Sequence, residues 1–187
     1  MKPIDNYDEI QPYQKGRKLP PGGYVVGIIS AAEKTESWGR VLEIKFDIAE
    51  GDYRKFFTDD FEKSRFDNKR YKGIHRLSLP NGDNPQDDNF KASVFKANME
   101  AIEASNPGFT WKWAESTLTG KKVGAIFFKK EYDYNGKQGF FTTVHSFCSA
   151  DDIRNGNFEI PPPKMLKQSS ASAEFVEMDV DDESLPF

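Results

Sequence analysis

Cations and aromatic rings alternate most densely between residues 53 and 76. This segment, YRKFFTDDFEKSRFDNKRYKGIHR, contains eight Lys or Arg, six aromatic rings and only four acids. Lys and Arg neutralise phosphates, while flat rings stack on unpaired bases, at about 1–3 kcal/mol per base. Each Phe could equally belong to a core, because Phe is often buried. The residues expected to contact a polyanion are Tyr53, Arg54, Lys63, Arg65, Phe66, Lys69, Arg70 and Tyr71.

Two other polar segments offer the same chemistry. Trp38 and Arg40 lie in a predicted loop, where core packing explains a Trp poorly. A predicted hairpin contributes Lys129, Lys130, Tyr132, Tyr134 and Lys137. Tyr132 and Tyr134 are two residues apart and so share one face of an extended segment, as successive bases require. The alternative is ordinary packing of the two Tyr rings across the hairpin.

Catalytic and metal-binding patterns are absent from the sequence. With only His75, His145 and Cys148, the chain lacks the four closely spaced ligands of a zinc site. Phosphate-loop, nucleophile-elbow and dinucleotide patterns do not occur either. Asp59 and Asp60 could hold a metal for nuclease chemistry, but adjacent loop acids are more often solvated. We therefore expect a protein that is not an enzyme and takes no cofactor or metal.

The elements that must position these residues are mostly strands. Residues 24–34 and 40–51 are predicted strands, the second because apolar and charged residues alternate from Leu42 to Ile48. Residues 52–57 are predicted to form a third strand. Residues 58–89 have no clean period and predict a long loop that is functional or mobile. Trp111 and Trp113 are expected to cover one end of the fold and to serve its packing, not DNA binding.

A helix and a hairpin complete the predicted fold. Residues 90–105 have apolar residues at i, i+4 and i+7, with Asp88 or Asn89 as the N-cap. Residues 118–148 predict two strands joined at Asn135-Gly136. The expected fold is mainly β, a five-stranded OB-fold-like barrel with one helix between strands three and four.

Length and composition suit one domain with appendages. The 187 residues divide into a predicted N-terminal arm (1–18), an OB-fold domain (19–163) and a flexible, disordered acidic tail (164–187). A single Cys permits no internal disulfide and suits a reducing compartment. The N-terminus resembles no signal peptide, and no apolar run approaches the roughly 20 residues of a membrane span. We expect a soluble, cytoplasmic protein.

The net charge of -4 hides an asymmetry between body and tail. Residues 169–187 contain six acids and no Lys or Arg. The remaining 168 residues therefore have 26 basic and 24 acidic side chains, a balance of +2. A slightly basic body with an acidic tail is typical of nucleic-acid-binding proteins with interaction tails.

The final residues, DDESLPF, resemble the C-terminal tip of bacterial and phage single-stranded DNA-binding proteins. In that family an acidic run precedes a short apolar end closing in Pro-Phe, which docks on partner enzymes. Ser184 and Leu185 depart from the commonest form, which has an acid and an Ile there. The residues that match the tip are Asp181, Asp182, Glu183, Leu185, Pro186 and Phe187.

The resemblance implies a protein that coats single-stranded DNA without sequence preference during phage DNA replication or recombination. Its tip would recruit a polymerase, helicase, primase, nuclease or recombinase in the host cytoplasm. The opposite charges of body and tail further predict that the acidic tail lies in the basic groove of its own body when DNA is absent. The alternative is a non-enzymatic interaction or inhibitor protein, whose body binds protein and whose acidic tail mimics DNA.

Overall fold

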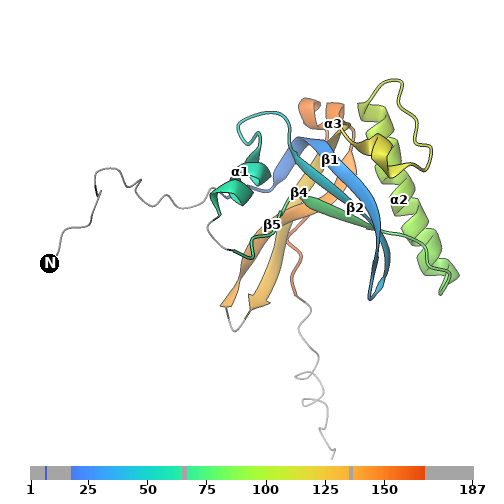
Figure 1. Ribbon diagram of the computed structural model, residues 1–187, viewed down its shortest axis with the longest axis horizontal. Coiled ribbons are helices and arrows are strands. Elements are labelled where there is room, and N and C mark those ends of the chain that lie inside the picture. The colour runs from blue at the N-terminus through green and yellow to red at the C-terminus, as the bar shows by residue number, and fades with distance from the viewer. Residues whose placement is uncertain (1–6, 8–17, 65–66, 135–136, 167–187) are drawn as a thin grey trace, which may run out of the picture.

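The fold is built on a five-stranded antiparallel sheet with the strand order β3-β2-β1-β4-β5 (Figure 1). The computed structural model describes residues 7, 18–64, 67–134 and 137–166. The elements, in chain order, are β1 (Gly22–Glu36), β2 (Gly39–Ile48), α1 (Phe56–Lys63), β3 (Ile74–Ser78), α2 (Pro85–Ser105), the 3-10 turn η2 (Glu115–Leu118), β4 (Lys122–Tyr134), β5 (Lys137–Cys148) and α3 (Ala150–Asn155). The predicted mainly β class is confirmed, and the described residues form three α-helices instead of the one expected.

The predicted third strand at residues 52–57 is wrong. These residues form a turn and the beginning of α1, because the Asp47 carboxylate accepts hydrogen bonds from Phe57 N (3.0 Å) and Thr58 N (2.9 Å). The true third strand, β3, lies in the segment expected to lack regular structure. It pairs with β2, His75 lying opposite Ile44.

The predicted helix between strands three and four is confirmed as α2, but it begins earlier than expected. Asn84 is its N-cap, with a side chain that accepts from Gln86 N and Asp87 N, and Pro85 occupies the first turn. Asn and Pro are favoured at these positions. Asp88, one predicted cap, instead accepts from Asn81 N at 3.0 Å.

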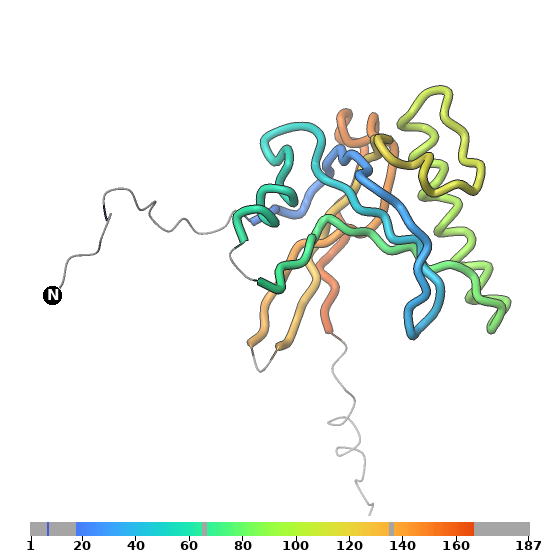
Figure 2. Tube along the Cα trace, in the orientation of Figure 1, coloured from blue at the N-terminus to red at the C-terminus, as the bar shows by residue number. Residues whose placement is uncertain are grey.

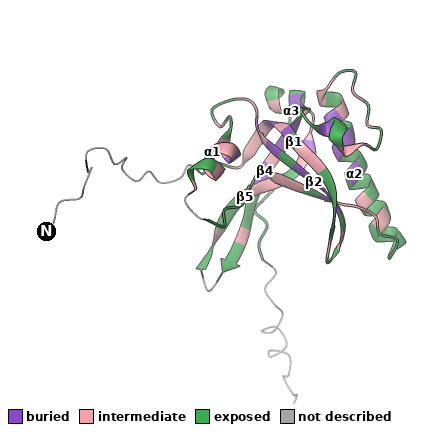
Figure 3. Ribbon diagram, viewed as in Figure 1, coloured by how far each residue is buried: buried purple, intermediate pink, exposed green. Residues whose placement is uncertain are grey.

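The core lies on the face of the sheet that α1 and α2 cover. The alternation predicted for residues 42–48 is confirmed, since Leu42, Ile44, Phe46 and Ile48 are all buried. The Phe46 ring packs edge-on against the rings of Phe57 and Phe127, whose centroids lie 5.6 and 6.1 Å away. Figure 3 shows buried residues concentrated where the sheet meets its helices, and exposed residues along the hairpin tips.

The two outermost strands, β3 and β5, meet through side chains. No backbone ladder joins them among the described residues, so the sheet is open there. The His75 ring of β3 lies 4.7 Å from the Phe147 ring of β5, centroid to centroid. Asn98 of α2 accepts from Phe147 N at 3.3 Å. Burial lowers the pKa of His75 to about 4, so at neutral pH this junction carries no charge.

The β4–β5 hairpin extends beyond the rest of the sheet as an arm. β1 pairs with β4 only from Lys122 to Phe127, so the later residues of β4 have only β5 as a strand partner. Figure 1 shows the tips of this arm and of the β1–β2 hairpin pointing the same way.

The C-terminal described segment runs along the free edge of β4 at the base of the arm (Figure 2). Lys164 N donates to Lys129 O and Glu131 N donates to Lys164 O, both at 2.9 Å. Beyond residue 166, the predicted tail lies outside the described residues. The predicted turn at Asn135-Gly136 lies outside them as well.

Candidate nucleic-acid interface

Strand register divides the arm into two faces of different chemistry. Residues directly opposite each other in an antiparallel pair project from the same face. Ala125 and Phe127 face the core, so the alternate residues of β4, beginning with Phe128, project from the outer side. The outer pairs of the arm are Lys130 with Phe141, Tyr132 with Gly139, and Tyr134 with Lys137. We define the arm face as Lys130, Tyr132, Tyr134, Lys137 and Phe141.

The rings of the arm face are accessible to a ligand. Tyr132, Tyr134 and Phe141 expose 41, 71 and 45% of their surface, more than core packing would leave. Tyr132 lies over Gly139, where a Cβ would come within 2.9 Å of the tyrosine oxygen. Its ring centroid is 6.3 Å from that of Phe141. The three rings and the two lysines thus offer stacking surfaces and cations together, with no acid among them.

The opposite face of the arm is different. Glu131 and Asp133 project there beside one exposed ring, Phe140, and Gln138 donates to Asp133 at 3.0 Å. Lys129 also belongs to this face, opposite Thr142. Lys129 and Lys130 therefore project from opposite faces of the arm. Of these two, Lys130 shares a face with Tyr132 and Tyr134. Phe141 was missed, although the alternation of β5 could have indicated it.

The β1–β2 hairpin supplies a further exposed ring, outside the arm. Trp38 lies at its tip and is exposed, as predicted for a ring outside the core. Arg40 is less available, because its Nε donates to Glu33 at 2.7 Å. The side-chain hydrogen bond and the charge of Glu33 raise the pKa of Arg40.

An unpredicted group of charges lies on the outer face of β1, β2 and β3. Glu43 is only 3% exposed and makes ion pairs with Lys34 at 2.6 Å and Arg76 at 2.7 Å. Burial opposes ionisation of Glu43, but the hydrogen bonds from Lys34 and Arg76 outweigh it, so its pKa is lowered. Exposed Lys45 lies on the same face. Three cations around one acid leave this surface positive.

The rings of the 53–76 segment pack inward. Phe57 is buried, and Tyr53 is half-buried with its ring 5.8 Å from that of Tyr24. The Tyr71 hydroxyl donates to Phe46 O at 3.0 Å, and burial raises its pKa to about 12. These rings stabilise the fold around α1. Phe66 and Arg65 lie outside the described residues.

The cations of the same segment remain at the surface. Lys63 pairs with Asp59 at 3.5 Å, and the Lys69 ammonium lies 4.8 Å from the centroid of the Phe61 ring. Arg54 and Arg70 are exposed. The segment therefore adds positive charge to the surface near α1, but its described rings are at most half-exposed.

Trp111 and Trp113 differ from each other in exposure. Trp111 is half-buried near Phe95, in agreement with its predicted structural role. Trp113 stacks on Phe95 with centroids 5.8 Å apart and an interplanar angle of 12°, yet it is 79% exposed. Its positive φ of 60° turns the backbone so that the ring covers Phe95 from outside.

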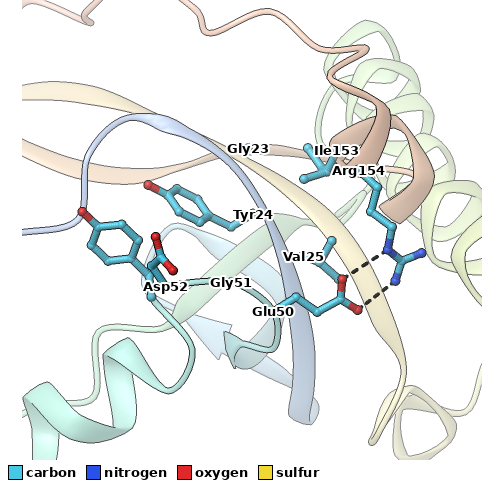
Figure 4. Close-up of a pocket in the computed structure, with 9 residues that line it drawn as sticks. Gly23, Tyr24, Val25, Glu50, Gly51, Asp52, Ile153 and Arg154 are labelled. Atoms are coloured by element: carbon cyan, nitrogen blue, oxygen red, sulfur yellow. Dashed lines mark hydrogen bonds and ion pairs between the residues drawn. The ribbon is translucent and has the colours of Figure 1, made fainter.

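A hollow of about 350 Å³ beside Tyr24 is a structural junction (Figure 4). Glu50, which follows β2, makes ion pairs with Arg154 of α3 at 2.8 Å and with Lys122 of β4 at 2.9 Å. Hydrogen bonds from Arg154 and then Lys122 lower the pKa of Glu50 to about 2. These ion pairs hold α3 against the sheet. Because Glu50, Arg154 and Lys122 are paired with one another, they are not available to bind a charged ligand.

The part of the chain that the structure describes offers neither a metal site nor a membrane-spanning helix. No group of three or more His, Cys, Asp and Glu could hold a metal ion there. None of its helices is long and apolar enough to cross a membrane. In comparisons with known proteins, no family model and no curated protein matched the chain.

Proposed function

We propose that this protein binds single-stranded DNA without sequence preference, with the arm face as its principal contact surface. The observation that carries the proposal is the gathering of three exposed rings and two lysines on one face of the hairpin. Stacking on rings tolerates every base, because every base has a π-face, and lysines contact the phosphates that all sequences share. Lack of sequence preference follows from the same chemistry.

The fold that suits this function is an OB-like, partly open barrel. The strand order and the contact between His75 of β3 and Phe147 of β5 support it, because they bring the outermost strands close together. Positive charge around Glu43 and the exposed ring of Trp38 would extend the binding surface beyond the arm. We leave Tyr53 and Tyr71 out of the proposed interface because both rings pack against the core.

The acidic tail would recruit partner enzymes of DNA replication or recombination. This part of the proposal rests on the resemblance of residues 181–187 to the tip of phage and bacterial single-stranded DNA-binding proteins. Leu166 N donates to the Glu131 carboxylate at 2.9 Å, so the tail begins beside the arm. The protein would act in the cytoplasm of a bacterial host, without catalysis, cofactor or metal.

Fluorescence anisotropy of labelled dT oligonucleotides tests the proposal. Wild-type protein should bind at low salt, and the Tyr132→Ala, Tyr134→Ala double variant should bind at least about 30-fold more weakly, from two stacked bases at 1 kcal/mol or more each. Phe90→Ala removes another exposed ring, on α2, and should change little. Failure of the wild-type protein to bind would reject the proposal and favour an interaction protein whose tail mimics DNA.

A further inference from the structure

We propose that a hollow at the base of the arm binds one nucleotide of the DNA strand by enclosing its base. The hollow has a volume of about 470 Å³ and is lined by Phe128, Val144, His145, Pro161, Pro162 and Lys164. This inference rests on the proposed function, because it names where a strand on the arm face would continue.

The hollow continues the line of the arm face toward the body of the protein. Phe128 precedes Lys130 by two residues on the same side of β4. Alternate residues of a strand are about 7 Å apart, so the line from Tyr134 through Tyr132 and Lys130 reaches Phe128 within about 20 Å. A strand that stacks on the arm rings therefore meets the hollow without changing direction.

The walls of the hollow match the shape of a base. Phe128 is buried and forms an apolar wall with Val144. The exposed His145 ring stands edge-on to Phe128, with centroids 5.2 Å apart and an interplanar angle of 80°. Prolines 161 and 162 complete the lining with two further rigid rings. Flat and apolar walls beside one imidazole can accept a planar, partly polar group.

The charges at the rim indicate that the occupant is a nucleotide and not a neutral apolar ligand. Lys164 lines the hollow, and its backbone is fixed against β4 by hydrogen bonds to Lys129 O and from Glu131 N. That pairing sets Lys164 beside Lys130 of the arm face. Two ammonium groups next to an apolar slot complement the phosphates on either side of an enclosed base.

The variant His145→Ala tests the hollow without disturbing the core, because His145 is exposed. Loss of one enclosed base predicts binding to dT oligonucleotides weakened about 5- to 150-fold, with no change in the salt slope. His145→Phe keeps a flat ring and should retain most of the affinity. Phe90→Ala on α2 is the matched control, and thermal unfolding should show that all variants fold.

Photocrosslinking of oligonucleotides containing 4-thiothymidine locates the enclosed base directly. Crosslinks to His145, or to the peptide that contains Pro161 and Pro162, are expected in addition to those on the arm. Unchanged affinity of His145→Ala and crosslinks confined to Tyr132 and Tyr134 would overturn the inference while leaving the proposed function intact. Absence of all oligonucleotide binding by the wild-type protein would overturn both.

Discussion

Replacing Lys130 and Lys129 with glutamine, one at a time, tests which face of the arm contacts DNA. Both lysines are exposed, and each substitution removes one positive charge from neighbouring positions. The two side chains differ in the face from which they project, since Lys130 lies opposite Phe141 and Lys129 opposite Thr142. Only the loss of Lys130 should remove a phosphate contact.

The size of the effect follows from counterion release. Each phosphate neutralised on a single strand contributes about 0.7 to the slope of log K against log salt. If the contact acts only in this way, its contribution disappears near 1 M salt. Lys130→Gln should then weaken binding about 8-fold at roughly 50 mM salt and about 3-fold at roughly 200 mM. For Lys129→Gln, the plot of log K against log salt should nearly coincide with that of the wild-type protein.

Anisotropy titrations of a labelled dT oligonucleotide at several salt concentrations provide the assay. Lys130→Arg keeps the charge and should restore both the affinity and the slope, which separates loss of charge from loss of a particular side chain. Thermal unfolding of each variant should match that of the wild-type protein, because neither lysine is buried.

Two results would refute the reasoning. Equal losses for Lys130→Gln and Lys129→Gln would mean that DNA responds to the overall field of the arm and that no face is preferred. A larger loss for Lys129→Gln would move the interface to the face that also contains Glu131 and Asp133. In that case the exposed rings of the arm face would have to be explained by contacts with protein.

Three further predictions concern the tail, α1 and the junction between β3 and β5. Deleting residues 169–187 removes six acids and no base, so anisotropy should show tighter binding to dT; unchanged or weaker binding would contradict a tail that competes with DNA. Asp47→Ala removes the carboxylate that accepts from Phe57 N and Thr58 N in the first turn of α1, as a capping side chain would. It should lower the free energy of unfolding in urea by about 0.5–2 kcal/mol, whereas Glu62→Ala on the exposed side of α1 should change it little. The pKa of His75 is lowered from 6.5 to about 4, so the folded state prefers the neutral ring. Its contribution is complete above pH 6.5 and is lost as the pH falls toward 4, by about 3 kcal/mol at most. Urea unfolding gives the free energy of unfolding at each pH between 7 and 4. This free energy should fall more steeply with decreasing pH for the wild-type protein than for His75→Phe. Equal pH dependence of the two proteins would show that His75 is not the cause.

Local patterns were sufficient where an element buries one face or pairs with its neighbour in the sequence. Leu42 to Ile48 alternate because β2 has a core on one side, and the β4–β5 hairpin needs only its neighbouring strand. Residues 52–57 misled because aromatic residues favour strands locally. Their conformation is decided instead by the carboxylate of Asp47, ten residues before Phe57.

The sequence by itself determined the chemistry of this protein: a basic body, an acidic tail, and rings at alternate positions of the hairpin. The tertiary structure decided which of those groups are available. Tyr71 and Phe57 pack in the core, while the pairing of β1 with β4 turns Phe127 toward the core and Lys130 toward the outer side of the arm. A shift of one residue would exchange its two faces, because side chains alternate along a strand. β1 and β4 lie far apart in the sequence, so only the tertiary structure fixes that register, and it thereby groups Lys130 with Tyr132, Tyr134 and Phe141.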